Sequence, residues 1–185
     1  YHLNQDNKFN FGIQAGNQNT WGMSSNNMQQ AGYGSPDSYL AGGKFGYNYS
    51  YWFNAEVSYD GMFGSNNSYY QGGFVSPYSY TIVNDPLYTS GLGAGMIEQG
   101  AGNSWRAATT FKILNEDLKL ELAFEQFLTA SPLNEYDIDI KYKPRLDGLK
   151  GLILHWEADY ATAPTWDVTN GGNFFFMETI ASYNF

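Results

Sequence analysis

The sequence predicts an all-β fold, an antiparallel β-barrel that crosses a membrane with its strands. Segments of alternating apolar and polar residues recur along the chain, which is typical of strands with one apolar and one polar face. The chain is 18% aromatic and contains 21 glycines, yet its mean hydropathy is only −0.44. Short and long connections alternate between the segments, as turns and loops do in membrane barrels.

Eight segments carry the alternation. In the clearest one, Leu and Phe residues at even positions from Leu118 alternate with Lys, Ala and Glu residues at odd positions. The last segment ends the chain with the same period of two. The eight predicted strands are Lys8–Gly16, Leu40–Ser50, Phe53–Tyr59, Ser104–Leu114, Leu118–Leu128, Glu135–Lys143, Leu149–Tyr160 and Phe174–Phe185.

The sequence predicts a single barrel domain spanning residues 1–185. The connections at one end of its strands are short, and those at the other end are mostly long. On the side of the C-terminus all the turns are short, at 51–52, 114–117 and 144–148. On the other side only 129–134 is short, and the long segments are 17–38, 60–103 and 161–173. Because loops beyond roughly 15 residues are usually functional or disordered, segment 60–103 has two interpretations. It folds into the lumen as a constriction, or it packs outside on neighbouring loops or subunits.

Composition excludes several other classes. A net charge of −9 and a pI near 4.4 argue against a nucleic-acid partner, because phosphates require Lys and Arg. The absence of cysteine rules out disulfides and thiolate metal sites. No apolar run is long enough for a transmembrane helix. Because the chain begins at Tyr1 rather than Met, we expect a processed protein or a fragment.

Two stretches carry a family resemblance. A final strand with Tyr183 and Phe185 resembles the terminal signature of bacterial outer-membrane β-barrels. The run Glu135-Tyr-Asp-Ile-Asp-Ile-Lys-Tyr-Lys-Pro144, followed by Leu146-Asp-Gly-Leu-Lys-Gly-Leu152, resembles the C-terminal part of outer-membrane porins. The porins in question are of the OprD-like and epsilonproteobacterial major-outer-membrane-protein type.

The resemblance implies a passive channel for small hydrophilic solutes in the bacterial outer membrane, without catalysis. Such barrels have roughly 16–18 strands, so the resemblance implies that this chain is the C-terminal part of one or needs partner chains to close. The implied partners are the lipid bilayer, lipopolysaccharide and small solutes, with a homotrimer left open. The alternative is a small closed eight-stranded barrel with a structural or surface-interaction role.

The candidate functional residues are the charges predicted to face inward. They either line a water-filled pore and set its ion preference, or neutralise one another inside a narrow closed barrel. They are Lys44, Glu56, Arg106, Lys112, Lys119, Glu121, Glu125, Asp137, Asp139, Lys141, Lys143, His155, Glu157, Asp159 and Glu178.

Two smaller patterns could carry site chemistry. We expect His155 to lie opposite Asp137 or Asp139, where it acts as a general base, holds a metal or forms a lining ion pair. Asp137 and Asp139, with Glu125 or Glu157 nearby, are candidate calcium ligands because Ca²⁺ accepts several carboxylate oxygens. No inward serine lies in a nucleophile motif, so the sequence predicts no enzyme and no cofactor other than this calcium ion.

Overall fold

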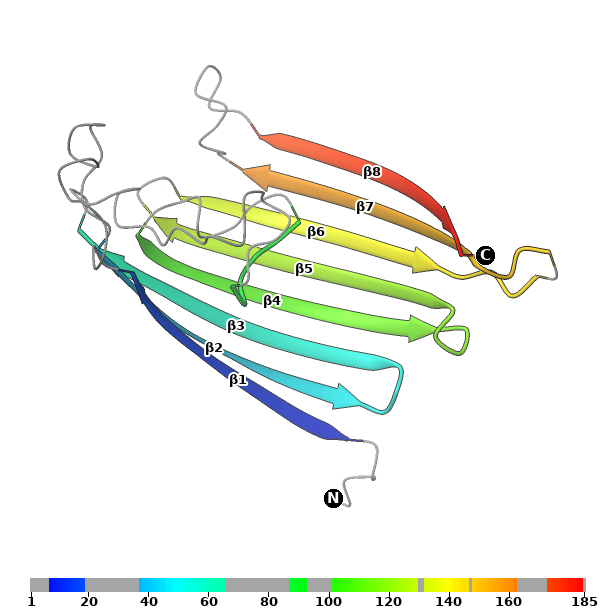
Figure 1. The fold of residues 1–185 in the computed structure, drawn as a ribbon, viewed down its shortest axis with the longest axis horizontal. Helices are drawn as coiled ribbons and strands as arrows, with labels where there is room; N and C mark the ends of the chain where they lie inside the picture. Colours follow the sequence, from blue (N-terminus) through cyan, green and yellow to red (C-terminus); the bar gives the residue numbers. More distant parts are fainter. Residues whose placement is uncertain are drawn as a thin grey trace.

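The computed structural model of the chain describes residues 7–18, 37–65, 87–92, 101–129, 132–146, 148–162 and 173–184. Eight β-strands form one antiparallel sheet in which each strand pairs with the next along the chain (Figure 1). No helix among these residues is long and apolar enough to cross a membrane. The strands are β1 (Lys8–Gln18), β2 (Ser38–Tyr49), β3 (Phe53–Gly64), β4 (Gly102–Ile113), β5 (Leu118–Thr129), β6 (Leu133–Tyr142), β7 (Leu152–Thr162) and β8 (Phe174–Tyr183).

The two ends of the sheet differ in the length of their connections (Figure 1). At one end, β2 and β3 are joined by residues 50–52, β4 and β5 by 114–117, and β6 and β7 by 143–151. Ser50 and the consecutive residues Leu114, Asn115 and Glu116 have φ values between 53° and 72°, a left-handed conformation that reverses the chain quickly. At the other end, the strand bounds leave residues 19–37, 65–101, 130–132 and 163–173 between strands. The predicted alternation of short and long connections is confirmed.

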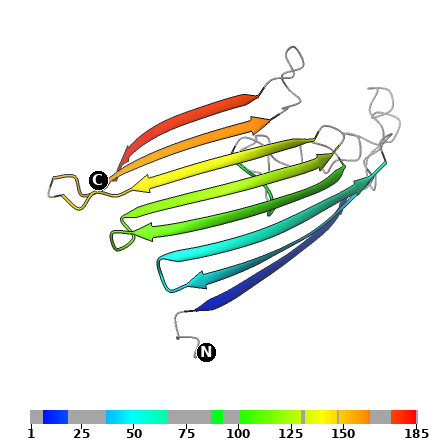
Figure 2. The same cartoon turned by 180° about the vertical axis from the view of Figure 1, so that it is seen from behind.

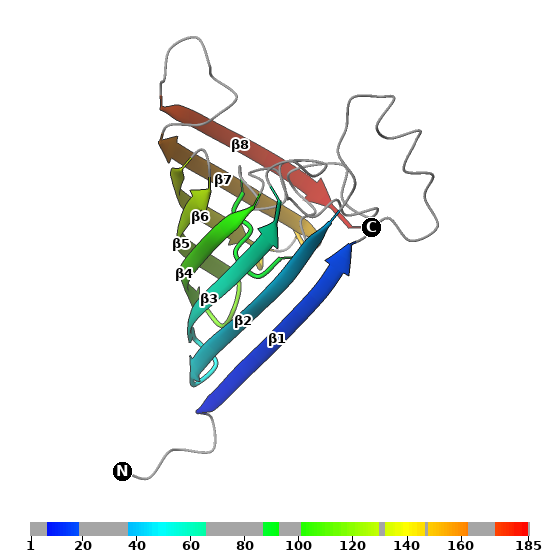
Figure 3. The same ribbon diagram turned by 90° about the vertical axis from the view of Figure 1, so that its left-hand side faces the viewer.

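The sheet curls into an open trough. Figure 2 shows its eight strands from behind, and the end view in Figure 3 shows β1 and β8 as the two edges. Among the described strand pairings, none joins β1 to β8. Residues 87–92, drawn in green, lie on the concave side of the trough (Figure 3).

The two faces of the sheet differ in charge. Every charged residue of the eight strands lies on the concave face, because the registers place these residues opposite one another or at alternate positions. The convex face carries large apolar side chains, of which Phe11 and Ile13 are more than 80% exposed. The charged set comprises six bases (Lys8, Lys44, Arg106, Lys112, Lys119, Lys141) and ten acids (Glu56, Asp60, Glu121, Glu125, Glu135, Asp137, Asp139, Glu157, Asp159, Glu178), together with His155.

Aromatic side chains pair across strands on the convex face. The ring centroids of Phe53 and Phe111 are 5.2 Å apart, and those of Tyr59 and Trp105 are 4.5 Å apart. Such cross-strand pairs stabilise an antiparallel sheet and fix its register. An all-strand antiparallel sheet with one uncharged and mostly apolar face confirms the predicted fold class.

Most predicted strand ends differ from the observed ones by one or two residues, and two differ by more. The third strand continues past Tyr59 to Gly64, which moves Asp60 from the predicted loop into β3. The fifth continues to Thr129. The seventh begins at Leu152 rather than Leu149, because Gly148 and Gly151 have left-handed φ values of 88° and 102° and belong to the preceding turn. The predicted final residue Phe185 lies outside the described residues.

Candidate functional site

The candidate site is the concave face of the sheet, which we call the inner face. All the candidate residues that lie within strands are on it, as the alternation predicts, and Lys143 follows β6 directly. They are not evenly exposed: Glu125, Asp137 and Asp159 are buried, whereas Glu178 on the edge strand is exposed. The inner face therefore contains distinct groups of charges.

A network of ion pairs connects β4, β5 and β6. The guanidinium of Arg106 donates through Nη2 to Glu121 Oε1 at 2.9 Å and through Nε to Glu125 Oε1 at 2.7 Å. The second oxygen of Glu121 accepts from Lys119 Nζ at 2.7 Å. Asp139 Oδ2 lies 3.9 Å from Lys119 Nζ and 3.4 Å from Lys141 Nζ. Acids and bases thus contact one another along each strand and diagonally between strands, which limits the repulsion between like-charged strand partners such as Lys119 and Lys141.

A second group contains carboxylates with little compensation. One oxygen each from Glu125, Glu135 and Asp137 lies within 4.8 Å of the others, and all three side chains are buried. Asp159 lies directly across from Asp137 and is 1% exposed. Within the described part of the chain, neither oxygen of Asp159 accepts a hydrogen bond. Arg106 contacts Glu125 in this group. We call the group, which comprises Glu125, Glu135, Asp137 and Asp159, the buried acidic cluster.

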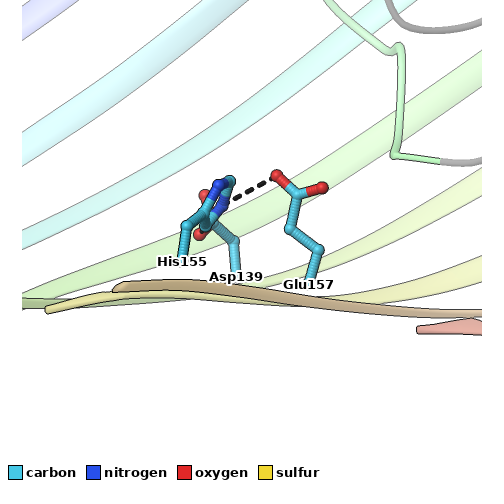
Figure 4. Close-up of side chains that lie close together, drawn as sticks. All are labelled: Asp139, His155 and Glu157. Atoms are coloured by element: carbon cyan, nitrogen blue, oxygen red, sulfur yellow. Dashed lines mark hydrogen bonds and ion pairs between the residues drawn. The ribbon is translucent and has the colours of Figure 1, made fainter. Parts of the chain in front are cut away.

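A third group lies nearer the short-turn end and contains the histidine. His155 Nε2 is 2.8 Å from Asp139 Oδ1 and 2.7 Å from Glu157 Oε1, and Figure 4 shows the three side chains converging on one face of β6 and β7. The strand partner of His155 is Lys141, so the predicted register opposite Asp137 or Asp139 was wrong. The predicted contact with Asp139 forms diagonally instead.

The two aspartates proposed as joint calcium ligands are divided between these groups. Asp137 belongs to the buried acidic cluster and Asp139 to the histidine group. Two residues on one strand face are about 7 Å apart along the strand. The torsions of the two side chains also determine how far apart their carboxylate oxygens lie, so joint binding of one Ca²⁺ ion by this pair stays a prediction.

Residues 87–92 are fixed to the inner face by polar contacts. Asp60 Oδ2 accepts hydrogen bonds from Thr89 N at 2.9 Å and from Thr89 Oγ1 at 3.0 Å. The amide of Leu92 donates to Asp137 Oδ2 at 2.9 Å, and the hydroxyl of Ser58 donates to Tyr88 O at 2.8 Å. The segment therefore crosses the inner face from β3 to β6.

Apolar packing also holds this segment. Leu87 joins Met62, Phe127, Leu133 and Ala161 in a buried cluster on the inner face, near the end with the long connections. Such a cluster is unexpected on the face that carries all the charged strand residues. It explains why residues 87–92 lie against the sheet, because burying a large apolar side chain contributes about 1.5–3 kcal/mol.

The sequence analysis missed three charged residues of the inner face, of which Lys8 begins the first predicted strand and was given no role. Asp60 was assigned to the loop that follows the third predicted strand, although it continues the even-numbered inward series of Glu56 and Ser58. Glu135 was placed at the start of the sixth predicted strand without a role, yet it is fully buried opposite Glu125. Extending each strand's alternation to its ends would have identified all three.

His155 Nε2 contacts two carboxylates, those of Asp139 and Glu157, and neither contact is with a hydroxyl group. The hydroxyls of Ser58 and Ser104 form hydrogen bonds within the wall and to residues 87–92. The arrangement can therefore bind cations and hold ordered water, and it gives no basis for a covalent reaction.

Comparison with known proteins supports the fold assignment. The chain is similar to Pseudomonas aeruginosa OccK5 (OpdH), with a TM-score of 0.64 and 13% identity over 99% of this chain and 47% of that chain. It is also similar to the outer membrane protein OprD from Pseudomonas aeruginosa, with a TM-score of 0.63 and 13% identity over 97% of this chain and 48% of that one. No family model and no curated protein matches the sequence.

The chain spans about half the length of these two structures. At 13% identity the likeness extends to the fold alone. The predicted resemblance to OprD-like proteins is confirmed at that level. The eight strands have the fold of part of an outer-membrane β-barrel wall.

Proposed function

We propose that this chain forms part of the wall of a bacterial outer-membrane channel through which small hydrophilic solutes diffuse without catalysis. The observation that carries the proposal is the confinement of every charged strand residue to the concave face, opposite a convex face that has no charged strand residue and is mostly apolar. Lipid accepts the apolar face, and water must reach the charged one. With ten acids and six bases on the inner face, this wall favours cations.

We also propose that further strands complete the barrel. An edge strand in lipid leaves unpaired amide and carbonyl groups, which cost several kcal/mol each. Both β1 and β8 are edges of the described sheet. The alternative of a closed eight-stranded barrel needs these two strands to pair, and the described pairings give it no support. The epsilonproteobacterial type, a homotrimeric assembly and contact with lipopolysaccharide belong to the same proposal.

Conductance in planar lipid bilayers tests the function. Purified native protein should give stable ohmic channels, with a reversal potential in a KCl gradient that indicates cation preference. A folded protein that inserts into the bilayer and never conducts would contradict the channel function. Anion preference would contradict only the argument from the charge of this wall.

Residues 87–92 narrow the channel in this proposal, and Asp60 is the anchor to test. Asp60→Ala removes a charged acceptor from two hydrogen bonds, each contributing about 1.5–3 kcal/mol. We expect faster amide hydrogen exchange across 87–92 and a larger single-channel conductance. Lys112→Ala, a change at an exposed residue near the short turns, is the matched control. Unchanged exchange at 87–92 in Asp60→Ala would show that other contacts hold the segment.

We further propose that the buried acidic cluster binds Ca²⁺, a ligand set that includes Asp137 and Glu125 of the predicted site. Opposite ligands of Ca²⁺ lie up to about 5 Å apart, and the oxygens of Glu125, Glu135 and Asp137 lie within 4.8 Å of one another. Asp159 supplies an independent reason, because a buried carboxylate without a hydrogen-bond donor is costly unless a cation approaches it.

Thermal unfolding in detergent tests the calcium proposal. At a Ca²⁺ concentration one hundredfold above Kd, binding adds about 2.7 kcal/mol of stability. For a domain of this size we expect an unfolding temperature roughly 5–10 °C higher in Ca²⁺ than in EGTA. Asp159→Asn should reduce this difference strongly, whereas Glu178→Gln, at an exposed carboxylate, should preserve it. Equal unfolding temperatures in Ca²⁺ and EGTA would rule out the site.

A further inference from the structure

The arrangement around His155 is built from one imidazole and two carboxylates on adjacent strands. Asp139 and Glu157 are direct strand partners, and His155 precedes Glu157 by two residues on the same face. A side chain reaches its diagonal neighbour across an antiparallel pair, so His155 meets Asp139 as well as Glu157. The register of β6 and β7 therefore brings all three groups to one point (Figure 4).

His155 Nε2 has more hydrogen-bond acceptors around it than its one hydrogen can serve. Two carboxylate oxygens approach this single nitrogen, at 2.8 Å and 2.7 Å. A ring nitrogen carries at most one hydrogen and can donate one well-aligned hydrogen bond. The two oxygens also repel each other when that hydrogen is shared. A divalent cation in place of the proton would be attracted by all three atoms at once.

The distances suit a small ion after a modest adjustment. Zinc lies about 2.0–2.2 Å from nitrogen and oxygen ligands, which places tetrahedral ligands about 3.4 Å apart. The distances from His155 Nε2 to the oxygens of Asp139 and Glu157 each need to increase by roughly 0.6 Å to reach that value. The side chains of His155, Asp139 and Glu157 are 13%, 13% and 21% exposed, so they contact water and are not rigidly enclosed.

The surrounding charges leave the ligand atoms accessible. Lys119 and Lys141 both lie near Oδ2 of Asp139, whereas Oδ1 faces the histidine. Lys119 is also paired with Glu121 at 2.7 Å. The two lysines therefore orient Asp139 through its other oxygen, as carboxylate-bound partners orient metal ligands in known sites. The three carboxylates of Asp139, Glu157 and Glu121 and the two ammonium groups of Lys119 and Lys141 give a net charge of −1 when His155 is neutral.

We infer that Asp139, His155 and Glu157 form a binding site for a divalent transition-metal ion, with Zn²⁺ as the best-suited ion. Imidazole with carboxylates is a donor set that zinc and its neighbours accept. Ca²⁺ prefers oxygen alone, which separates this site from the buried acidic cluster. Three protein ligands leave a fourth position for water or a solute on the open inner face.

Calorimetric titration of the detergent-extracted native protein with ZnCl₂, in a buffer containing excess Ca²⁺, tests the inference. We expect one saturable site for each chain. His155→Gln should weaken binding at least tenfold, and so should Glu157→Gln, which provides a second variant if the first does not fold. The sequence has two histidines, His2 and His155, so His2→Gln is the matched control and should bind as the native protein does.

Absence of Zn²⁺ binding by the folded native protein would overturn the inference. Binding that His155→Gln leaves unchanged, or that His2→Gln removes, would also overturn it. The titration requires no conduction, so this result is independent of the channel proposal. If the protein conducts, Zn²⁺ should reduce the current through the native channel. The Zn²⁺ concentration that halves the current should be at least tenfold higher for His155→Gln.

Discussion

Replacing Arg106 with methionine is expected to destabilise the protein by about 3–5 kcal/mol, the cost of leaving a buried charge without its partner. Arg106 is the base that contacts Glu125, whose side chain has no exposed surface. Glu121 also loses a 2.9 Å contact but retains Lys119. Methionine preserves most of the apolar stem of Arg106, so the loss of stability measures chiefly the loss of the positive charge. Equilibrium unfolding by guanidinium in EGTA-containing detergent buffer measures it.

Two further variants separate this effect from a general loss of charge. Lys112→Met removes a base whose side chain is 44% exposed and lies 3.8 Å from Glu116, and it should cost less than about 1 kcal/mol. Glu125→Gln in the Arg106→Met background should recover at least about 1 kcal/mol, because the two residues are directly coupled. Equal destabilisation by Arg106→Met and Lys112→Met would contradict the ion-pair network.

Leu122→Lys is the second change with a large expected effect. Leu122 lies near the centre of β5 on the apolar face and is 41% exposed in the isolated sheet. A lysine facing the middle of the bilayer costs about 2–4 kcal/mol in a membrane barrel. We expect slower and less complete folding into lipid vesicles, measured by the shift of the folded band on unheated gels and by urea unfolding in those vesicles.

Thr110→Lys is the matched control for Leu122→Lys. Thr110 lies on the inner face directly across from Glu121, so its replacement introduces the same charge into the wall on the other side. This variant should fold into vesicles with nearly native yield. If both variants fold equally well, or if Thr110→Lys is the more damaging, the assignment of the two faces is wrong.

The fold could be predicted because each strand repeats the same local rule. In β5, Leu118, Leu120 and Leu122 alternate with Lys119 and Glu121, and the structure keeps this division across all eight strands. Charged and apolar side chains need different surroundings, so the alternation alone determines the faces. Strand ends were predicted less well. Gly61 and Gly64 flank Met62 and Phe63, and glycine is depleted in strands, so the end of β3 resembled a loop.

The grouping of the inner charges could not be predicted, because it depends on register. Alternation places Asp137, Asp139 and His155 on one face but does not determine which residues of β6 and β7 are opposite. A shift of one pair along the sheet would have put His155 across from a different residue. The turn at 143–151, with its two left-handed glycines, connects β6 and β7 in the observed register. The sequence left open whether segment 60–103 folds into the lumen, because the contact of residues 87–92 with the inner face depends on the distant residues Asp60 and Asp137.

Cysteine substitutions of the adjacent residues Thr109 and Thr110 test most directly whether the inner face lines an aqueous pathway and the convex face contacts lipid. The native sequence has no cysteine, and these two threonines lie on opposite faces of β4. In planar bilayers, a charged membrane-impermeant thiol reagent should react with Thr110→Cys and lower its conductance, while Thr109→Cys should neither react nor change. Reaction at Thr109→Cys alone, or equal reaction at both positions, would contradict the account.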